Sequence, residues 1–346
     1  MKSRNSDLKF GVIGVGWQGQ AHLQTLSANP LAELSAVCDI EEQRLKQQAD
    51  AFDVPLRFTD FNDLLARDDI EAVVIALPDH LHRESTLSAL SAGKHVLLEK
   101  PMAVSVEDAL AIRNAARRSG TCFMINLTNR WMYSFSKGKE ILDSGQVGEL
   151  RYVYARMTNR IQVPTKLLPW LHHSHPAHWI GVHRLDIARW WSGSEVVRVR
   201  GVQRYGVLRD MNYDAPDFFQ AIIEFQNGVV MSLEVHWILP QNYPVPVDSK
   251  FYALCSRGVI DIDRVRSELM SVSSDSVTIS TPIAGPTLDQ QNGFVYAASR
   301  HFVDCALTGK KPLVDAEDGL ALTRVLCAVV ESCKNDGKVV ELNPDE

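Results

Sequence analysis

The feature that most constrains the fold is a glycine-rich segment near the start of the chain. An apolar run, residues 10–13, leads into Gly14, Gly16 and Gly19, spaced G-x-G-x-x-G, and then into residues that suit a helix. In a strand–turn–helix unit the first glycine allows the turn, the second lets the backbone approach a pyrophosphate, and the third allows close helix packing. The helix N-terminus adds unpaired N–H groups and a partial positive charge. The segment therefore favours a dinucleotide-binding unit over an ordinary turn.

An acidic residue ends the second predicted strand, residues 34–38. Asp39 follows the glycines by about twenty residues, where a carboxylate accepts both hydroxyls of an adenosine ribose and repels a 2′-phosphate. The next residues, 40–42, contain no arginine or lysine, so the sequence favours NAD over NADP. The alternative is that Asp39 only caps the helix that begins near Glu41.

Apolar runs alternate with helical segments as far as residue 126. The run 72–76 is apolar throughout, as is typical of a strand buried on both faces of a parallel sheet. Leu77 and Pro78 end it on the side where nucleotides bind in open α/β sheets. Residues 1–126 are therefore predicted to form a doubly wound parallel Rossmann sheet.

A second candidate centre is Glu99-Lys100-Pro101, which follows the short apolar run 95–98. A lysine at the carboxyl end of such a strand projects toward the cofactor, where a desolvated ammonium donates a hydrogen bond to a substrate oxygen. The proline restricts the backbone of the lysine to extended conformations. The alternative is a surface Lys-Pro turn.

Together these motifs resemble the Gfo/Idh/MocA oxidoreductases, which include glucose–fructose oxidoreductase, inositol 2-dehydrogenase and rhizopine-catabolism proteins. Residues 129–131, Asn-Arg-Trp, are similar to the Arg-aromatic element of that family, and residues 312–321 resemble the entry to its last helix. The candidate cofactor-binding residues are Gly14, Gly16, Trp17, Gln18, Gly19, Asp39, Leu77, Pro78, His82, Glu99, Lys100 and Pro101.

The second half of the chain, residues 127–346, has a different pattern. Alternating strands are predicted at 150–157, 196–204, 217–225, 229–237, 251–256 and 259–263, and closing helices at 300–307 and 315–333. Asn227-Gly228 and Arg257-Gly258 are hairpin signals, so the sheet should be mostly antiparallel. The Ser/Thr/Pro-rich stretch 271–292 is predicted to be rich in loops. The resemblance implies an open sheet with one face toward the cofactor and the other forming a homodimer or homotetramer.

A predicted helix carries Gly181-Val182-His183-Arg184-Leu185-Asp186, which matches the Gly-x-His-x-x-Asp motif of the family. His183 and Asp186 share a helix face. The resemblance implies that His183 takes the hydroxyl proton while hydride leaves, with Lys100 assisting, and the pKa of histidine suits this role. The alternative is a histidine packed on the inner face of the helix.

One position departs from the family. Many members have an aspartate four residues before the histidine, and here that residue is Trp179. Either another residue, His175, His178 or Asp186, replaces the aspartate, or Trp179 stacks on the substrate. The candidate substrate-binding residues are therefore Arg130, Trp170, His178, Trp179 and Asp186. Arg184 is expected to be a solvated charge or to bind an acidic group.

Composition excludes several classes of protein. The net charge is −6 without a basic stripe, so no nucleic-acid partner is expected. No run of about 18 apolar residues predicts a membrane span, and the polar N-terminus lacks a signal peptide, so a cytoplasmic protein is expected. The six cysteines are scattered, and the four histidines in 172–178 lack a partner ligand, so no metal is expected.

These observations predict an NAD-dependent dehydrogenase that acts on a CH–OH group of a ring substrate, a sugar, sugar acid or cyclitol. Lys100 and His183 are the expected catalytic residues. Trp179 motivates a second hypothesis, a dihydrodiol-type or other non-sugar dehydrogenase of the same family. A third is an NAD-binding sensor without catalysis.

Overall fold

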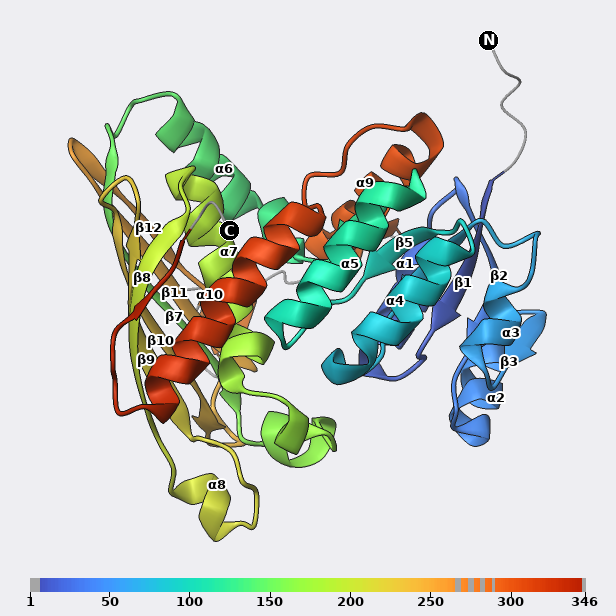
Figure 1. Ribbon diagram of the computed structural model, residues 1–346, viewed down its shortest axis with the longest axis horizontal. Helices are drawn as coiled ribbons and strands as arrows, with labels where there is room; N and C mark the ends of the chain where they lie inside the picture. The colour runs from blue at the N-terminus through green and yellow to red at the C-terminus, as the bar shows by residue number, and fades with distance from the viewer. Residues whose placement is uncertain (1–6, 265–268, 273–276, 281–283, 288–289, 344–346) are drawn as a thin grey trace. The chain divides into compact units, whose positions relative to one another are not determined.

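The structure is a computed structural model that describes residues 7–264, 269–272, 277–280, 284–287 and 290–343. It contains two compact units, Met1–Thr128 with Ala284–Leu320, and Asn129–Ile283 with Ala321–Glu346. Each unit is built on one large sheet (Figure 1). Within the described residues, no helix is both long and apolar enough to cross a membrane.

The first unit contains a six-stranded parallel sheet in the order β3-β2-β1-β4-β5-β6. The strands are β1 (Leu8–Ile13), β2 (Ala32–Cys38), β3 (Leu56–Phe58), β4 (Ala72–Ile75), β5 (His95–Leu98) and β6 (Phe123–Ile125). All four residues of β4 are buried, in agreement with the apolar run that predicted it. The predicted parallel Rossmann sheet is confirmed. Strand β3 was not predicted, because three residues are too few to show a hydrophobic period.

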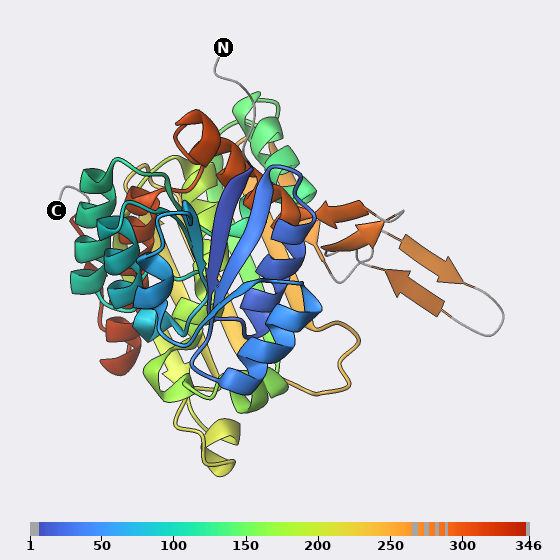
Figure 2. The same ribbon diagram turned by 90° about the vertical axis from the view of Figure 1, so that its right-hand side faces the viewer.

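Helices cover both faces of this sheet, with α1 and α2 on one side and α4 and α5 on the other (Figure 2). The helices are α1 (Trp17–Ser27), α2 (Glu42–Ala51), α3 (Phe61–Leu65), α4 (His82–Ser91) and α5 (Val106–Ser119). The ends of α5 follow local chemistry, because the Ser105 side chain accepts a hydrogen bond from the Asp108 N–H and Gly120 takes a left-handed conformation.

A late segment of the chain completes the first unit. Helix α9 (Phe294–Thr308) places Phe302 against Phe10 of β1, with the two ring centroids 6.1 Å apart. The Tyr296 hydroxyl donates a hydrogen bond to the Ala28 carbonyl at 3.3 Å. Residues 284–320 therefore pack with the sheet that begins the chain.

The expectation of loops over residues 271–292 is corrected in part. Short hairpins are present, β13 (Leu269–Val272) with β14 (Val277–Ser280), and β15 (Ala284–Thr287) with β16 (Gln290–Gly293). The Val and Thr residues that accompany the serines favour strands, which the overall composition obscured. Residues 273–276, 281–283 and 288–289 of that expectation lie outside the described residues.

The second unit contains a seven-stranded sheet in the order β12-β11-β7-β10-β9-β8-β17, in which only the pairing of β10 with β7 is parallel. The strands are β7 (Leu150–Arg160), β8 (Val196–Arg204), β9 (Phe218–Phe225), β10 (Val230–Leu239), β11 (Val247–Cys255), β12 (Gly258–Asp263) and β17 (Val340–Glu341). The mostly antiparallel sheet is thus confirmed. Burial alternates along β10, as it does when one face packs on a core.

Helices α6 (Tyr133–Asp143) and α7 (Val182–Ser192) lie on one face of this sheet (Figure 1). Trp191 of α7 packs between the rings of Phe135 and Phe251, with centroid distances of 6.5 and 5.1 Å. Gly138 of α6 is required there, because a Cβ would lie 2.4 Å from the Trp191 ring. The remaining helices are α8 (Val207–Asp210) and α10 (Ala316–Lys334), which passes from the first unit to the second.

Candidate functional site

The glycine turn between β1 and α1 has the geometry of a phosphate cradle. Gly14 has a φ of +86°, and a Cβ on Gly19 would lie 2.0 Å from the Gly14 oxygen, so neither position accepts another side chain without strain. Nothing lies within 4 Å of the Cβ position of Gly16, and no side chain of the described chain caps α1. The open space and the first N–H groups of α1 fit a dinucleotide pyrophosphate.

Asp39 lies at the end of β2 and is buried. It accepts hydrogen bonds from the Val15 and Glu41 N–H groups, each at 3.0 Å. Arg44, in the first turn of α2, donates from Nε at 3.0 Å and from Nη2 at 2.6 Å. Burial would raise the pKa of Asp39, but the bonds from Arg44 and the two amides hold that pKa below its ordinary value. The cap of α2 is Glu41 rather than Asp39, because Glu41 accepts from the Gln43 and Arg44 N–H groups.

Glu99 joins three parts of the first unit. Its Oε1 lies 2.8 Å from His22 Nε2 of α1 and accepts a hydrogen bond from Asn126 Nδ2 at 2.7 Å. Its Oε2 accepts the Lys100 N–H at 3.2 Å. The carboxylate is fully buried, which by itself raises its pKa, yet His22, Lys100 and Asn126 lower the pKa to about 2. Glu99 is therefore a buried anion held by its neighbours.

Lys100 follows Glu99 and is buried at the carboxyl end of β5. Burial lowers the pKa of its ammonium, while the carboxylates of Glu99 and Asp79 oppose that shift. The peptide bond from Lys100 to Pro101 is cis. The nearby His82 places Nδ1 2.8 Å from the Pro101 oxygen and Nε2 3.0 Å from the Leu77 oxygen. His82 thereby links the two loops that were predicted to contact the cofactor.

The second unit contains a buried ion pair. Arg130 donates to Asp186 from Nη2 at 2.6 Å and from Nε at 3.1 Å, and both side chains are almost fully buried. Both residues were predicted to bind substrate, and the pairing gives them a structural role in holding α7. His183 lies on the same helix and is half-buried.

The aromatic candidates also lie in the second unit. Trp179 is in a π-helical turn, Ala177–Gly181, that runs directly into α7. The Trp170 and Trp179 rings are 6.4 Å apart and stand edge to face. The two tryptophans that were predicted to bind substrate are therefore neighbours within the second unit.

The histidines proposed to replace the family aspartate are buried. Burial lowers the pKa of His175 to about 4 and that of His178 to about 3. His175 Nε2 lies 2.8 Å from Gln203 Oε1, and His178 Nε2 lies 3.9 Å from the Cys327 sulfur. Both imidazoles are neutral core groups at neutral pH, so they do not supply the charge of an aspartate.

Two further histidines, His172 and His173, are exposed, with their rings 4.0 Å apart. Across the part of the chain that the structure describes, no group of three or more His, Cys, Asp or Glu side chains is arranged to hold a metal ion.

Arg184 differs from its expected role as a solvated charge. Its side chain is 0% exposed, and its guanidinium lies 4.7 Å from the centre of the Phe135 ring. Among the described residues, none donates or accepts a hydrogen bond with any of its three nitrogens. Burial, followed by the charge of Arg264, lowers the pKa of Arg184 to about 9, while Asp186 opposes the shift. No sequence pattern indicates this burial, because an arginine between two motif residues usually faces solvent.

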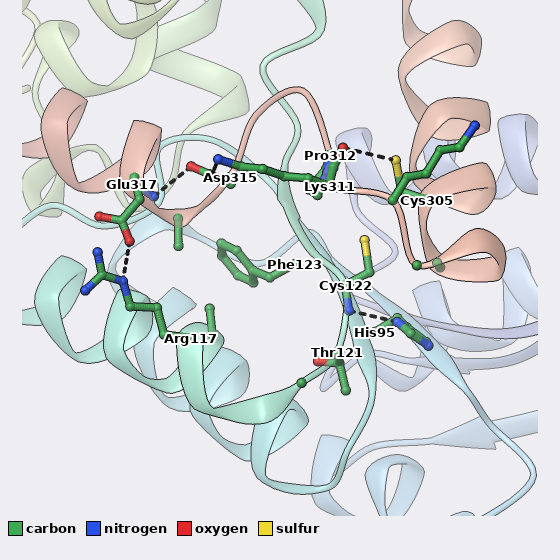
Figure 3. Close-up of a pocket in the computed structure, with 16 residues that line it drawn as sticks. His95, Arg117, Thr121, Cys122, Phe123, Cys305, Lys311, Pro312, Asp315 and Glu317 are labelled. Atoms are coloured by element: carbon green, nitrogen blue, oxygen red, sulfur yellow. Dashed lines mark hydrogen bonds and ion pairs between the residues drawn. The ribbon is translucent and has the colours of Figure 1, made fainter.

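A separate cavity of about 320 Å³ lies in the first unit, at the amino ends of β5 and β6 (Figure 3). Four of its charged side chains form two ion pairs, Lys311 with Asp315 at 2.7 Å and Arg117 with Glu317 at 2.6 Å. Burial raises the pKa of the Cys122 thiol in its wall to about 12. Lys100 follows the opposite end of β5, so this cavity is not the predicted cofactor site.

The candidate residues divide between the units. The predicted cofactor-binding residues, Lys100 included, belong to the first unit, whereas Arg130, Trp170, His178, Trp179, His183 and Asp186 belong to the second. The sequence analysis missed Arg44, because it considered only the residues directly after Asp39.

Two family models match the chain. One, described as "Oxidoreductase family, NAD-binding Rossmann fold", matches residues 8–127. The other, described as "GFO/IDH/MocA C-terminal domain", matches residues 135–261. The two matches cover the parallel sheet and most of the antiparallel sheet.

Curated relatives include dehydrogenases of ring compounds. Inositol 2-dehydrogenase 2 of Saccharopolyspora erythraea is 32% identical over 66% of each chain. A 1-carboxy-3-chloro-3,4-dihydroxycyclohexa-1,5-diene dehydrogenase of Comamonas testosteroni is 28% identical over 65% of this chain and 57% of its own length. This chain thus spans about two thirds or less of these two relatives.

The fold is also that of a solved structure, scyllo-inositol dehydrogenase from Lactobacillus casei with NAD(H) and scyllo-inositol. The TM-score is 0.85 at 20% identity, over 97% of this chain and 99% of that one.

The buried Glu99 predicts a specific acid sensitivity. Folding lowers the pKa of Glu99 from 4.5 to about 2. The Glu99 carboxylate therefore makes its whole contribution to the unfolding free energy above pH 4.5, and this contribution is lost as the pH falls toward 2. Urea unfolding at several pH values should show a shallower loss of unfolding free energy below pH 4.5 for Glu99→Gln than for the wild type. Glu84→Gln, an exposed control, should keep the wild-type slope. If the unfolding free energy of the wild type and of Glu99→Gln falls with the same slope below pH 4.5, the lowered pKa of Glu99 is contradicted.

Arg184 predicts an unusual stability change. Replacing a buried charge that has no hydrogen-bond partner with an apolar side chain is neutral or stabilising, so Arg184→Met should raise the unfolding free energy by about 0–2 kcal/mol. Arg130→Met should instead lower it by about 3–5 kcal/mol, because the buried Asp186 carboxylate loses the guanidinium that is paired with it. Chemical denaturation measures both, and a loss above about 2 kcal/mol for Arg184→Met would show that the guanidinium stabilises the fold.

Proposed function

Because the chain belongs to the Gfo/Idh/MocA family of oxidoreductases, we propose that it transfers a hydride between NAD and a hydroxyl-bearing carbon of a ring substrate, a sugar, sugar acid or cyclitol. The single observation that carries the proposal is the buried Lys100 beside the Glu99 carboxylate, at the sheet edge that also carries the glycine turn.

The first unit supplies the groups that hold the cofactor. The open position at Gly16 and the N–H groups of α1 accept the pyrophosphate, and Asp39 accepts the adenosine ribose. When bound, NAD supplies a nicotinamide ring that accepts the hydride.

In this proposal His183 accepts the proton and Lys100 donates a hydrogen bond to the substrate oxygen. In such an oxidation, His183 would take the proton of the substrate hydroxyl, and the hydrogen of the ring C–H bond would leave with its electron pair as the hydride that NAD accepts. Lys100 donates a hydrogen bond to the same oxygen as it becomes a carbonyl. A buried cation suits this role, because it stabilises the negative charge that develops on the oxygen.

Ring substrates are supported by the relatives named above and by the Trp170–Trp179 pair. The face of a tryptophan ring packs on the C–H face of a cyclitol or sugar, and this contact requires no ionic group on the protein or on the substrate. The same pair favours the second candidate, a dihydrodiol-type dehydrogenase, and one relative is named as a dehydrogenase of a dihydroxycyclohexadiene. A non-catalytic NAD sensor remains the third candidate, and the presence of both candidate catalytic groups, Lys100 and His183, argues against it.

The homo-oligomer is proposed to form through the seven-stranded sheet. Its strands carry exposed apolar side chains that alternate with the buried ones, namely Val202, Phe218, Ile222, Leu254 and Val259. Exposed apolar side chains gathered on one sheet are typical of a surface that another protein covers.

Lys100→Met tests the catalytic role. It should leave NAD affinity within about threefold and lower turnover by about a hundredfold or more, the usual contribution of an acid–base group. A panel of inositols, sugar acids and aromatic cis-diols supplies the substrate, and activity on diols alone would favour the second candidate.

The matched control is Lys94→Met, which removes another buried lysine of the same unit. Lys94 donates to the Arg67 and Ile70 carbonyls at 2.7 and 2.8 Å, before β5 rather than after it. Its turnover per folded protein should equal that of the wild type. Unchanged turnover in Lys100→Met would remove the role assigned to this lysine.

A further inference from the structure

The carboxylate of Asp39 has no remaining capacity for a ribose. Two carboxylate oxygens offer about four lone-pair positions. Four donors fill them, the Val15 N–H and Arg44 Nε on Oδ2, and the Glu41 N–H and Arg44 Nη2 on Oδ1. Two ribose hydroxyls therefore cannot both donate to Asp39 until one of these donors leaves.

Only Arg44 is able to leave. The Val15 and Glu41 donors are main-chain groups, fixed by the glycine turn and by the start of α2. Arg44 reaches Asp39 through a flexible side chain that is 41% exposed, so its guanidinium is the one of the four donors that can turn away into solvent. The Glu41 carboxylate, with Oε2 4.0 Å from Arg44 Nη1, offers the displaced guanidinium another partner.

We propose that Arg44 occupies the ribose position of Asp39 in the cofactor-free protein and sets the ratio of NAD to NADP affinity. NAD must displace the guanidinium, so Arg44 weakens NAD binding. A 2′-phosphate would instead bind Arg44, because guanidinium pairs with phosphate through two hydrogen bonds.

The cavity that Arg44 lines is consistent with the displacement of its guanidinium by the ribose of NAD. It has a volume of about 370 Å³ and is lined by Gly16, Trp17, Gln20, Arg44 and Gln47, among others. Glu41, the partner open to a displaced Arg44, lines the same cavity, so the guanidinium can leave Asp39 and remain in the cavity wall. While Arg44 is paired with Asp39, a 2′-phosphate meets two side chains with no net charge rather than a lone carboxylate. The proposal rests on the dinucleotide site but not on the substrate or on the catalytic roles.

Calorimetric titration of the full chain with NAD+ and with NADP+ at one ionic strength tests the proposal. Arg44→Gln should bind NAD+ about 3–10-fold more tightly and NADP+ about tenfold or more weakly than the wild type. Arg44→Lys should also bind NAD+ more tightly but keep part of the NADP+ affinity, because it retains the charge without the planar fork.

Arg57→Gln is the matched control. Arg57 is 39% exposed, close to the exposure of Arg44, and pairs with Asp50 at 2.6 Å in the same unit, so its loss removes an arginine ion pair that does not involve Asp39. Both nucleotide affinities should stay at the wild-type values.

The outcomes separate this proposal from the proposed function. If the wild type binds NAD+ and Arg44→Gln changes neither affinity, or weakens NAD+ binding, Arg44 does not occupy the ribose position and the dehydrogenase proposal stands. If the wild type binds neither nucleotide, both proposals fail.

Discussion

The first unit depends on one buried carboxylate. Glu99 connects α1 through His22, the end of β6 through Asn126, and the backbone of Lys100. A lone carboxylate in this position would cost several kcal/mol of desolvation, so these partners are a condition of the fold. The same contacts hold the helix that follows the glycine turn beside the strand end that carries the lysine. The helix after the glycine turn and the backbone of Lys100 are thus held by the same buried carboxylate.

Much of the fold follows from local sequence patterns. Apolar runs with glycine and proline breaks predict β1, β4, β5 and β6, because a strand buried on both faces has few polar residues. Alternation of apolar and polar residues predicts β7 to β12, because a strand with one buried face shows this pattern. The glycine spacing predicts the phosphate cradle, since steric demands at Gly14 and Gly19 leave no other residue type.

The remainder depends on contacts that the sequence does not reveal. Arg130 and Asp186 are 56 positions apart, and only the packing of α7 brings them together. Arg44 reaches back to Asp39 because α2 begins between them. The residues directly after Asp39 therefore do not indicate this pairing. Arg184 is buried because α7 is surrounded on nearly all sides, although the motif around it predicts an amphipathic helix. His175 and His178 resemble site residues by composition and are core residues by burial.

The glycine turn, Asp39 and Arg44 belong to the first unit, whereas Trp179, which stands where the family resemblance implies an aspartate, belongs to the second. The most direct test of hydride transfer uses ring polyols and cis-diols that carry deuterium on their hydroxyl-bearing carbons, with NAD+ and mass spectrometry of the reduced nucleotide. The account predicts NADH that contains one deuterium, formed by the wild type and lost in Lys100→Met. NADH without the label, or no reduction with any ring substrate, would contradict it.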